Sequence, residues 1–177
     1  MTNQITMHSA SVPMFTQMLT TLSRVLDKAE AHATSRKITP AALLEARLFP
    51  DMYPMTSQVQ STCDFAKGAV SRLAGVAVPR FEDNEKTFDE LRTRIAKTHA
   101  FIQSVEAASI NGSEDRDIEL KFGGKRLRFK GREYLVGFVI PSMVFHMTIA
   151  YAILRHNGVE LGKADFLGEL LERSAAR

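Results

Sequence analysis

Apolar side chains recur three and four residues apart in four separate stretches of this sequence of 177 residues. This spacing places them on one face of an α-helix, so each stretch predicts a helix that packs one face against a partner. The four stretches are residues 12–29, 59–73, 88–105 and 135–153. Four such helices in one short chain predict an all-α fold in which the helices bury one another's apolar faces.

A β-hairpin is predicted between the third and the fourth helix, where the apolar period changes from 3.6 to 2. Alternating apolar and charged residues flank Gly123-Gly124 on both sides. A Gly-Gly pair favours a two-residue turn, because both residues can adopt a positive φ. The hairpin then covers about residues 118–129, with Leu120 opposite Leu127, and its apolar face is expected to pack on the helices.

Length and composition indicate one cytosolic domain over residues 1–177. Cys63 is the only cysteine, which excludes a disulfide scaffold and suits a reducing cytosol. The first twelve residues have neither a basic nor a strongly apolar region, so we expect no signal peptide. The net charge of +3 is too small to indicate nucleic-acid binding without a concentrated patch.

Residues 134–154 contain no Asp, Glu, Lys or Arg and are long enough to cross a membrane. Pro141, Ser142 and His146 interrupt this stretch, and the three other amphipathic helices need a partner that covers them. A helix that is apolar on all sides can also be the central element of a soluble bundle. We therefore expect no membrane span.

Ser142 and His146 are polar side chains on the apolar face of the fourth predicted helix. They are four residues apart, so both are expected to point into the bundle. Pro141 precedes them and predicts a kink, because its ring clashes with a carbonyl one turn earlier. A kinked helix with inward polar groups is a suitable wall for a ligand cleft. The alternative is a buried histidine with one structural hydrogen bond.

Other candidate residues are less constrained by spacing. Asp51, Tyr53 and Tyr151 carry polar groups and are expected near this cleft. Cys63 lies on an apolar helix face, where a cysteine more often acts as an inert small hydrophobe than as a nucleophile. Together with Ser142 and His146, these residues form our candidate ligand-binding set, and no catalytic residue is assigned.

Six basic residues gather around the predicted hairpin, namely Lys121, Lys125, Arg126, Arg128, Lys130 and Arg132. Such a cluster can bind nucleic acid or an acidic partner if it shares one face. Basic side chains on an exposed hairpin also prevent edge-to-edge pairing with other strands. We favour the second interpretation, so nucleic acid is not an expected partner.

A resemblance to a known family is carried mainly by the C-terminal part of the chain. The matching residues are Phe145-His146, Ala150-Tyr151, Ile153-Leu154-Arg155-His156-Asn157-Gly158-Val159, Gly162-Lys163 and Asp165-Phe166-Leu167-Gly168. Shorter matches are Ser11-Val12-Pro13, Cys63-Asp64, Ala66-Lys67-Gly68 and Arg72-Leu73-Ala74-Gly75. The chain resembles an uncharacterised bacterial family, domain of unknown function 1993, of the DinB-like (YfiT-like) superfamily of proposed metalloenzymes.

This resemblance implies a DinB-like four-helix bundle in up-down-down-up order, often a homodimer, with a site at one end. Typical members bind a divalent metal through three histidines, one on the second helix and two on the fourth. Only His146 matches that set, because Ser142 takes the place of the other histidine on the fourth helix. The second helix offers only Gln58, Thr62 and Cys63 as inward candidates.

We therefore expect no metal cofactor. Zinc or nickel needs about three firm nitrogen, sulfur or carboxylate donors. If one of these metals binds at all, the ligands would be His146, Cys63 and an acidic residue such as Asp51.

Three functions remain open. The first is an unknown small molecule bound in a cleft lined by His146, Ser142 and Tyr151, with or without metal-free catalysis. The second is a metal-dependent enzyme of the thiol-transferase kind found among DinB-like relatives. The third is a dimeric structural or interaction module without chemistry. The missing histidines argue against the second function and the polar pair argues against the third, so we favour the first.

Overall fold

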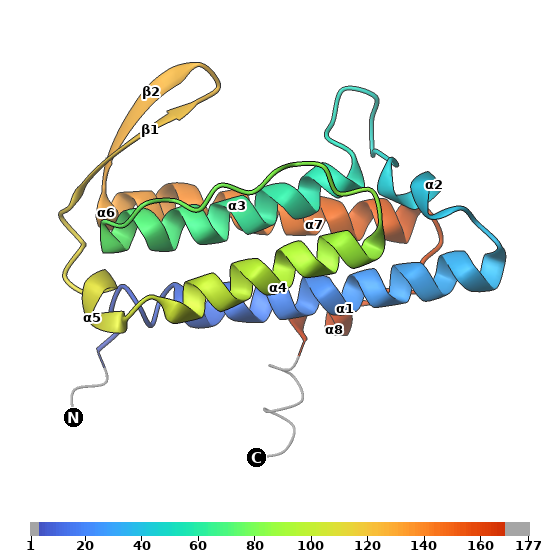
Figure 1. Cartoon of the computed structure of the whole chain (residues 1–177), viewed down its shortest axis with the longest axis horizontal. Helices are drawn as coiled ribbons and strands as arrows, with labels where there is room; N and C mark the ends of the chain where they lie inside the picture. Colours follow the sequence, from blue (N-terminus) through green and yellow to red (C-terminus); the bar gives the residue numbers. More distant parts are fainter. Residues whose placement is uncertain (1–3, 169–177) are drawn as a thin grey trace, which may run out of the picture.

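The structure, a computed structural model, describes residues 4–168 and folds them mostly into helices (Figure 1). Residues 1–3 and 169–177 of the predicted single domain lie outside the described residues. The long helices are α1 (Val12–Arg36), α3 (Met55–Ala74), α4 (Phe88–Ser104) and α7 (Ile140–His156). The prediction of a mainly helical fold is thereby confirmed.

Shorter elements lie between these helices and after the last of them. They are α2 (Pro40–Leu44), α5 (Ala107–Ile110), α6 (Gly131–Glu133), the π-helix η1 (Tyr134–Val139) and α8 (Lys163–Leu167), with the strands β1 (Asp117–Phe122) and β2 (Lys125–Lys130). Gly75 ends α3 with a φ of 73°, a conformation that favours glycine. From there the chain returns along α3 to the start of α4 (Figure 1).

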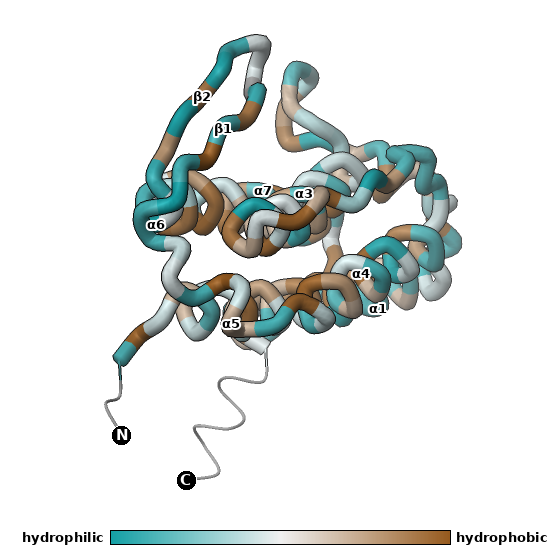
Figure 2. The backbone as a smooth tube through the Cα atoms, turned by 60° about the vertical axis from the view of Figure 1, so that its left-hand side comes forward, coloured by the Kyte–Doolittle hydropathy of each residue, from teal (hydrophilic) through white to brown (hydrophobic). Residues whose placement is uncertain are grey.

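The long helices lie in two layers, with α3 and α7 in one and α1 and α4 in the other (Figures 1 and 2). Their facing sides form the core, which includes the fully buried Phe15, Leu19, Leu73, Phe88 and Leu91. These residues occupy the predicted seams of the first three helices. The apolar period of the sequence therefore places the core correctly in this part of the chain.

The fourth helix differs from its predicted seam. Met143 and Met147 are buried, whereas Ser142 and His146 are only half-buried. The cause is η1, because each turn of a π-helix holds about one residue more than an α-helical turn and rotates the face that follows. The expectation that Ser142 and His146 point into the bundle interior is therefore wrong.

The hairpin forms with the predicted register, and Leu120 lies opposite Leu127 while Ile118 lies opposite Phe129. Both strands rise away from the helices at one end of the α3 and α7 layer (Figure 1). The base of the hairpin packs on η1, where the rings of Phe129 and Phe138 stack with centroids 5.3 Å apart. The apolar face of the hairpin thus contacts the helices at its base.

Leu120→Asp tests this contact, because Leu120 is half-buried and packs against the core. We expect the free energy of unfolding to fall by about 1–2 kcal/mol, since part of an apolar side chain is replaced by a charge. Lys121→Asp, at the exposed neighbouring position, is the matched control and should change stability little. Thermal unfolding of the three proteins measures the difference, and an unchanged melting temperature for Leu120→Asp would mean that the hairpin is not held by the bundle.

Candidate functional site

His146 on α7 faces α3, where its side chain meets Gln58. The His146 Nδ1 and the Gln58 Oε1 are 2.7 Å apart. Gln58 is almost completely buried, and its Nε2 donates to the backbone carbonyl of Tyr53 at 3.1 Å. Since that amide nitrogen faces a carbonyl, the oxygen of the same amide must face the histidine.

The orientation of Gln58 fixes the tautomer of His146. An amide oxygen only accepts hydrogen bonds, so the proton of a neutral imidazole lies on Nδ1. Burial lowers the pKa of His146 below its usual 6.5, because desolvation disfavours the charged ring. His146 is therefore neutral at pH 7, with a lone pair on Nε2.

The Nε2 atom that carries this lone pair is not fully buried. Within residues 4–168, the Nε2 of His146 makes no hydrogen bond. It is also absent from the fully buried polar atoms without a partner, so part of its surface is accessible. A neutral imidazole nitrogen can accept a hydrogen bond, accept a proton or bind a metal ion. The imidazole therefore offers one hydrogen-bond acceptor, Nε2, whose orientation is set by the bond from Nδ1 to Gln58.

Aromatic rings surround the imidazole. Phe65 on α3 stacks on it with centroids 5.5 Å apart and planes 25° apart. Phe145 approaches edge-on at 5.3 Å, and 53% of its surface remains exposed. Phe65 also contacts Phe138 of η1 at 5.7 Å, which links this group to the base of the hairpin.

The segment that leads into α3, residues 45–54, rises from the same layer as the hairpin (Figures 1 and 2). It carries Phe49 and Tyr53, whose side chains are 64% and 61% exposed. The backbone carbonyl of Tyr53 is the partner of Gln58, so this segment supports the histidine through the amide. We call His146, Gln58, Phe65 and Phe145 the His146 site.

The remaining candidates occupy different places. The Ser142 hydroxyl donates to the carbonyl of Phe138 at 2.6 Å, and Asp51 is exposed in the segment before α3. The Tyr151 hydroxyl donates to the carbonyl of Leu161 at 3.2 Å and so anchors the segment after α7. Within residues 4–168, no hydrogen bond or ring contact joins Tyr151 or Asp51 to His146.

Cys63 is fully buried in α3. Burial raises the pKa of its thiol to about 12, which a hydrogen bond with Thr98 only partly opposes. At neutral pH the sulfur is protonated, and only a thiolate is a strong nucleophile or metal ligand. The interpretation of Cys63 as a small hydrophobe fits this environment.

The donors around His146 do not fit a zinc or nickel site. Among residues 4–168, no three His, Cys, Asp or Glu side chains gather closely enough to hold a metal ion. His146 is the one suitable donor of the His146 site, because Gln58 is already bonded at both ends of its amide. A site of this kind needs three firm protein ligands.

We expect the purified protein to hold far less than one zinc or nickel ion per chain, because a single imidazole binds either ion weakly. Elemental analysis after dialysis against metal-free buffer measures the content. A content near one metal ion per chain would contradict this account of the donors.

Sequence reasoning does not identify Arg94 on α4, which makes several bonds to the connection between α3 and α4. Only 2% of it is exposed, and its Nη2 pairs with Asp64 at 2.8 Å and Asp83 at 2.9 Å. Its Nη1 donates to Glu85 at 2.9 Å and to the carbonyl of Glu82 at 3.1 Å. Arg94 thus fastens the connection to the two helices.

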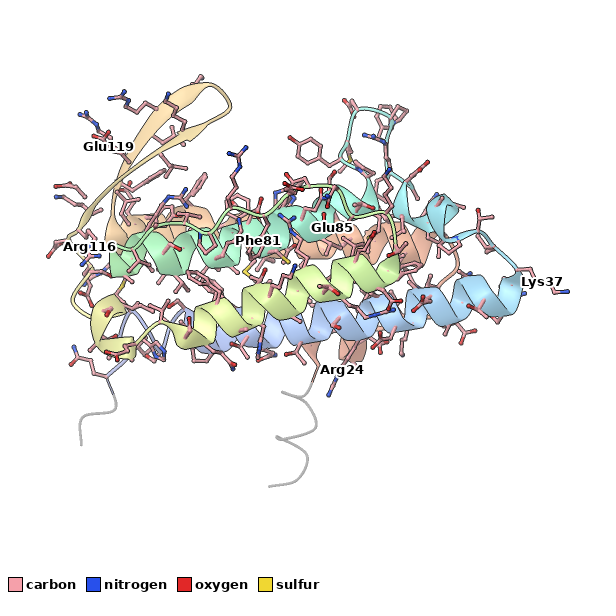
Figure 3. All side chains as sticks on the ribbon, in the orientation of Figure 1. Arg24, Lys37, Phe81, Glu85, Arg116 and Glu119 are labelled. Atoms are coloured by element: carbon pink, nitrogen blue, oxygen red, sulfur yellow. The ribbon has the colours of Figure 1, made fainter. Side chains whose placement is uncertain are left out.

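We call Arg94 with its partners Asp64, Asp83 and Glu85 the Arg94 cluster. Within it, opposite charges stabilise one another. Burial opposes the charge of Arg94, yet its bonds to Glu85 and Asp64 hold its pKa above the ordinary value. Burial likewise opposes the charge of Glu85, but hydrogen bonds from Gln60 and Arg94 outweigh it and lower the pKa. Phe81 covers the guanidinium, with its ring centroid 5.6 Å away. Figure 3 labels Phe81 and Glu85 on this connection beside α3. The two Nη atoms of Arg94 are engaged in the fold, whereas its buried Nε has no hydrogen-bond partner within residues 4–168.

Comparison with known proteins agrees with this architecture. Residues 7–167 match the family model described as a domain of unknown function, DUF1993. No curated protein matches the chain. The crystal structure of a DinB family member from Shewanella denitrificans is 39% identical, covers 91% of each chain and superimposes with a TM-score of 0.82. The resemblance drawn from the sequence is thereby confirmed. The chain belongs to the DUF1993 family and is DinB-like.

Proposed function

We propose that this protein binds a small molecule at the His146 site, through an aromatic or apolar body and one hydrogen-bond donor. The observation that carries the proposal is the open Nε2 of a neutral histidine, held in place by a buried amide.

We also propose that the protein acts in the cytosol, the compartment expected from the sequence. The up-down-down-up helix order implied by the family also belongs to the proposal, and the return of the chain along α3 supports that order.

The surroundings favour a ligand of this chemistry. Phe65 and Phe145 flank the imidazole, and the exposed part of Phe145 offers an aromatic face or edge to a ring. Small-molecule sites commonly combine an apolar lining with a few fixed polar groups. The amide of Gln58 supplies the fixed orientation, since it holds the ring before any ligand arrives.

A matched pair of probes tests the proposal. Phenol carries an aromatic ring and a hydroxyl donor, whereas anisole carries the same ring without the donor. We expect phenol to bind several-fold more tightly than anisole, up to about tenfold, which is the range of one hydrogen bond. Titrations followed by NMR should shift the signals of His146, Phe65 and Phe145 together. Equal binding of both probes, or shifts elsewhere, would contradict the proposal.

His146→Asn is the variant matched to this test. The amide nitrogen of asparagine can replace Nδ1 as the donor to Gln58, while the Nε2 acceptor is lost. We expect the variant to stay folded and to lose the preference for phenol. If the preference survives in the folded variant, the acceptor is not Nε2.

A further inference from the structure

Arg72 on α3 carries a half-buried guanidinium that has no carboxylate partner within residues 4–168. Its Nη1 donates to the hydroxyl of Tyr134 at 3.0 Å, and its Cζ lies 6.0 Å from the centroid of the same ring. A charge that is partly removed from water is normally balanced by an opposite charge. The described part of the chain gives Arg72 a neutral partner but no counter-charge.

Other charges near Arg72 are either paired or missing. The other charged residues of α3 are Asp64 and Lys67, which pair with each other at 2.7 Å. Helix α7 lies beside α3 in the same layer (Figure 1), and η1 and α7 have no charged residue between Glu133 and Arg155. Where α3 packs on η1, Arg72 is therefore the one charge without an opposite charge among the described residues.

Gly68 allows the guanidinium to lie flat on α3. Phe65, Gly68 and Arg72 are three and four residues apart, so they share one face of the helix. A Cβ atom at residue 68 would lie 2.5 Å from the Nη1 of Arg72, and no other side chain lies within 4 Å of that point. The side chain of Arg72 is thus folded back over Gly68 toward Phe65. Packing between helices does not require a glycine here, although glycine destabilises a helix interior.

A row of aromatic rings joins this guanidinium to the His146 site. Phe65 stacks on His146 and contacts Phe138, and Phe138 stacks on Tyr134 with centroids 6.0 Å apart. Phe65 and Gly68 are separated by about 4.5 Å along the helix axis. The guanidinium therefore lies on the order of 10 Å from the imidazole, about the length of a benzene ring with a short side chain.

One edge of the guanidinium is open. The Nε and Nη2 atoms of Arg72 make no hydrogen bond within residues 4–168, and neither is one of the fully buried polar atoms without a partner. These two atoms donate in parallel from the same edge of the planar group. Such an edge matches the two oxygens of a carboxylate and holds them through two charge-assisted hydrogen bonds.

We propose that Arg72 binds the carboxylate of a ligand whose other end reaches the Nε2 of His146. The ligand class is then an aromatic carboxylic acid that carries a hydrogen-bond donor at the end opposite its acid group. The donor end rests on the proposed function, whereas the acid end rests on the geometry of Arg72 and Gly68.

A carboxylate fits this place better than a phosphate. A phosphate dianion needs more than one cation, and the nearest other cation on α3, Lys67, is already paired with Asp64. The rings of Phe65, Phe138 and Tyr134 line the way from Arg72 to His146. This lining suits a ligand with a single charge at one end.

Two probes that differ only in charge test the proposal. 3-(4-Hydroxyphenyl)propionate and its primary amide carry the same ring and the same hydroxyl donor, but only the first carries a carboxylate. We expect the wild type to bind the acid at least about tenfold more tightly than the amide, because charge-assisted hydrogen bonds are the stronger kind. Titrations followed by NMR should shift the signals of Arg72 Nε and of His146 together.

Gly68→Ala is the most specific variant for this test. It keeps every charge, but its methyl group displaces the guanidinium, which lies at the end of a flexible side chain. We expect the preference for the acid to fall at least about threefold while the helix stays folded, since alanine favours helix.

Arg72→Met removes the charge and should abolish the preference for the acid. It also leaves the hydroxyl of Tyr134 without its partner, so Gly68→Ala decides the test if Arg72→Met does not fold. Lys97→Met is the matched control, because it removes an exposed charge on α4 and should leave the preference unchanged.

Two results would overturn the proposal. They are equal binding of acid and amide by the wild type, and a preference for the acid that survives in both Gly68→Ala and folded Arg72→Met. Phenol and anisole are compared in the same proteins. A wild type that prefers the acid over the amide but does not prefer phenol over anisole contradicts the role of His146 and leaves that of Arg72 intact.

Discussion

Arg94→Leu should lower the free energy of unfolding by about 3 kcal/mol, within the range seen when one partner of a buried ion pair is removed. The guanidinium holds three carboxylates and one carbonyl, and leucine replaces none of these bonds. The largest part of the loss is expected at Glu85, because its side chain is only 10% exposed and its buried charge would lose the cation that pairs with it. Urea unfolding of both proteins measures the loss.

Arg92→Leu is the matched control on the same helix. Arg92 also faces three carboxylates, those of Asp27, Glu30 and Asp89, but its side chain is 22% exposed and its partners are open to water. Surface pairs of this kind contribute at most about 1 kcal/mol. If the two leucine variants lose the same free energy of unfolding, the burial of the Arg94 cluster adds nothing to stability.

Acid should weaken the same cluster. The pKa of Glu85 is lowered in the folded protein, so its contribution is complete above its unfolded value near 4.5 and is lost as the pH falls through the folded pKa. The wild type should therefore lose stability below about pH 4.5 more steeply than Arg94→Leu. Parallel slopes would show that Glu85 is not stabilised through Arg94.

Gly131→Ala should cost about 2 kcal/mol or more, as in other overpacked sites. A Cβ atom at residue 131 would lie 1.9 Å from the carbonyl oxygen of Ser113. That oxygen belongs to backbone, and the segment after it is fixed by Arg116, whose Nη1 donates to the carbonyl of Leu73 at 2.7 Å. The base of the hairpin must shift to admit the methyl group.

Gly162→Ala is the control for this substitution. The nearest atom to its added Cβ is 4.0 Å away, and its φ of −127° is accessible to any residue. We expect a change within about 0.5 kcal/mol, measured by the same urea unfolding. A Gly131→Ala protein as stable as this control would mean that the contact with Ser113 is not rigid.

The sequence predicts those parts of the fold that depend on local patterns. Helix seams follow from apolar spacing, and the hairpin register follows from Gly123-Gly124, because both signals lie within a few residues of the structure they determine. The rotation of α7 could not be predicted in this way. A π-helix has no sequence signature of comparable strength. The predicted apolar face therefore keeps the α-helical period past Val139, where the real helix has rotated.

The candidate site was predicted only in its centre. His146 is recognisable in the sequence because a polar residue interrupts an apolar run. Gln58 is one of three inward candidates on the second predicted helix. The bond between them joins residues 88 positions apart, and no local pattern encodes such a pairing. The same holds for Arg94, whose acidic partners lie on α3 and on the connection after it.

The protonation state of His146 tests the central claim most directly. NMR of nitrogen-15-labelled protein can resolve the two ring nitrogens of each of the five histidines, and His146→Asn assigns the signal. We predict a neutral ring at pH 7, with the proton on Nδ1, a bare Nε2, and a pKa below the ordinary 6.5. A charged ring at pH 7, or a neutral ring with its proton on Nε2, would contradict the account.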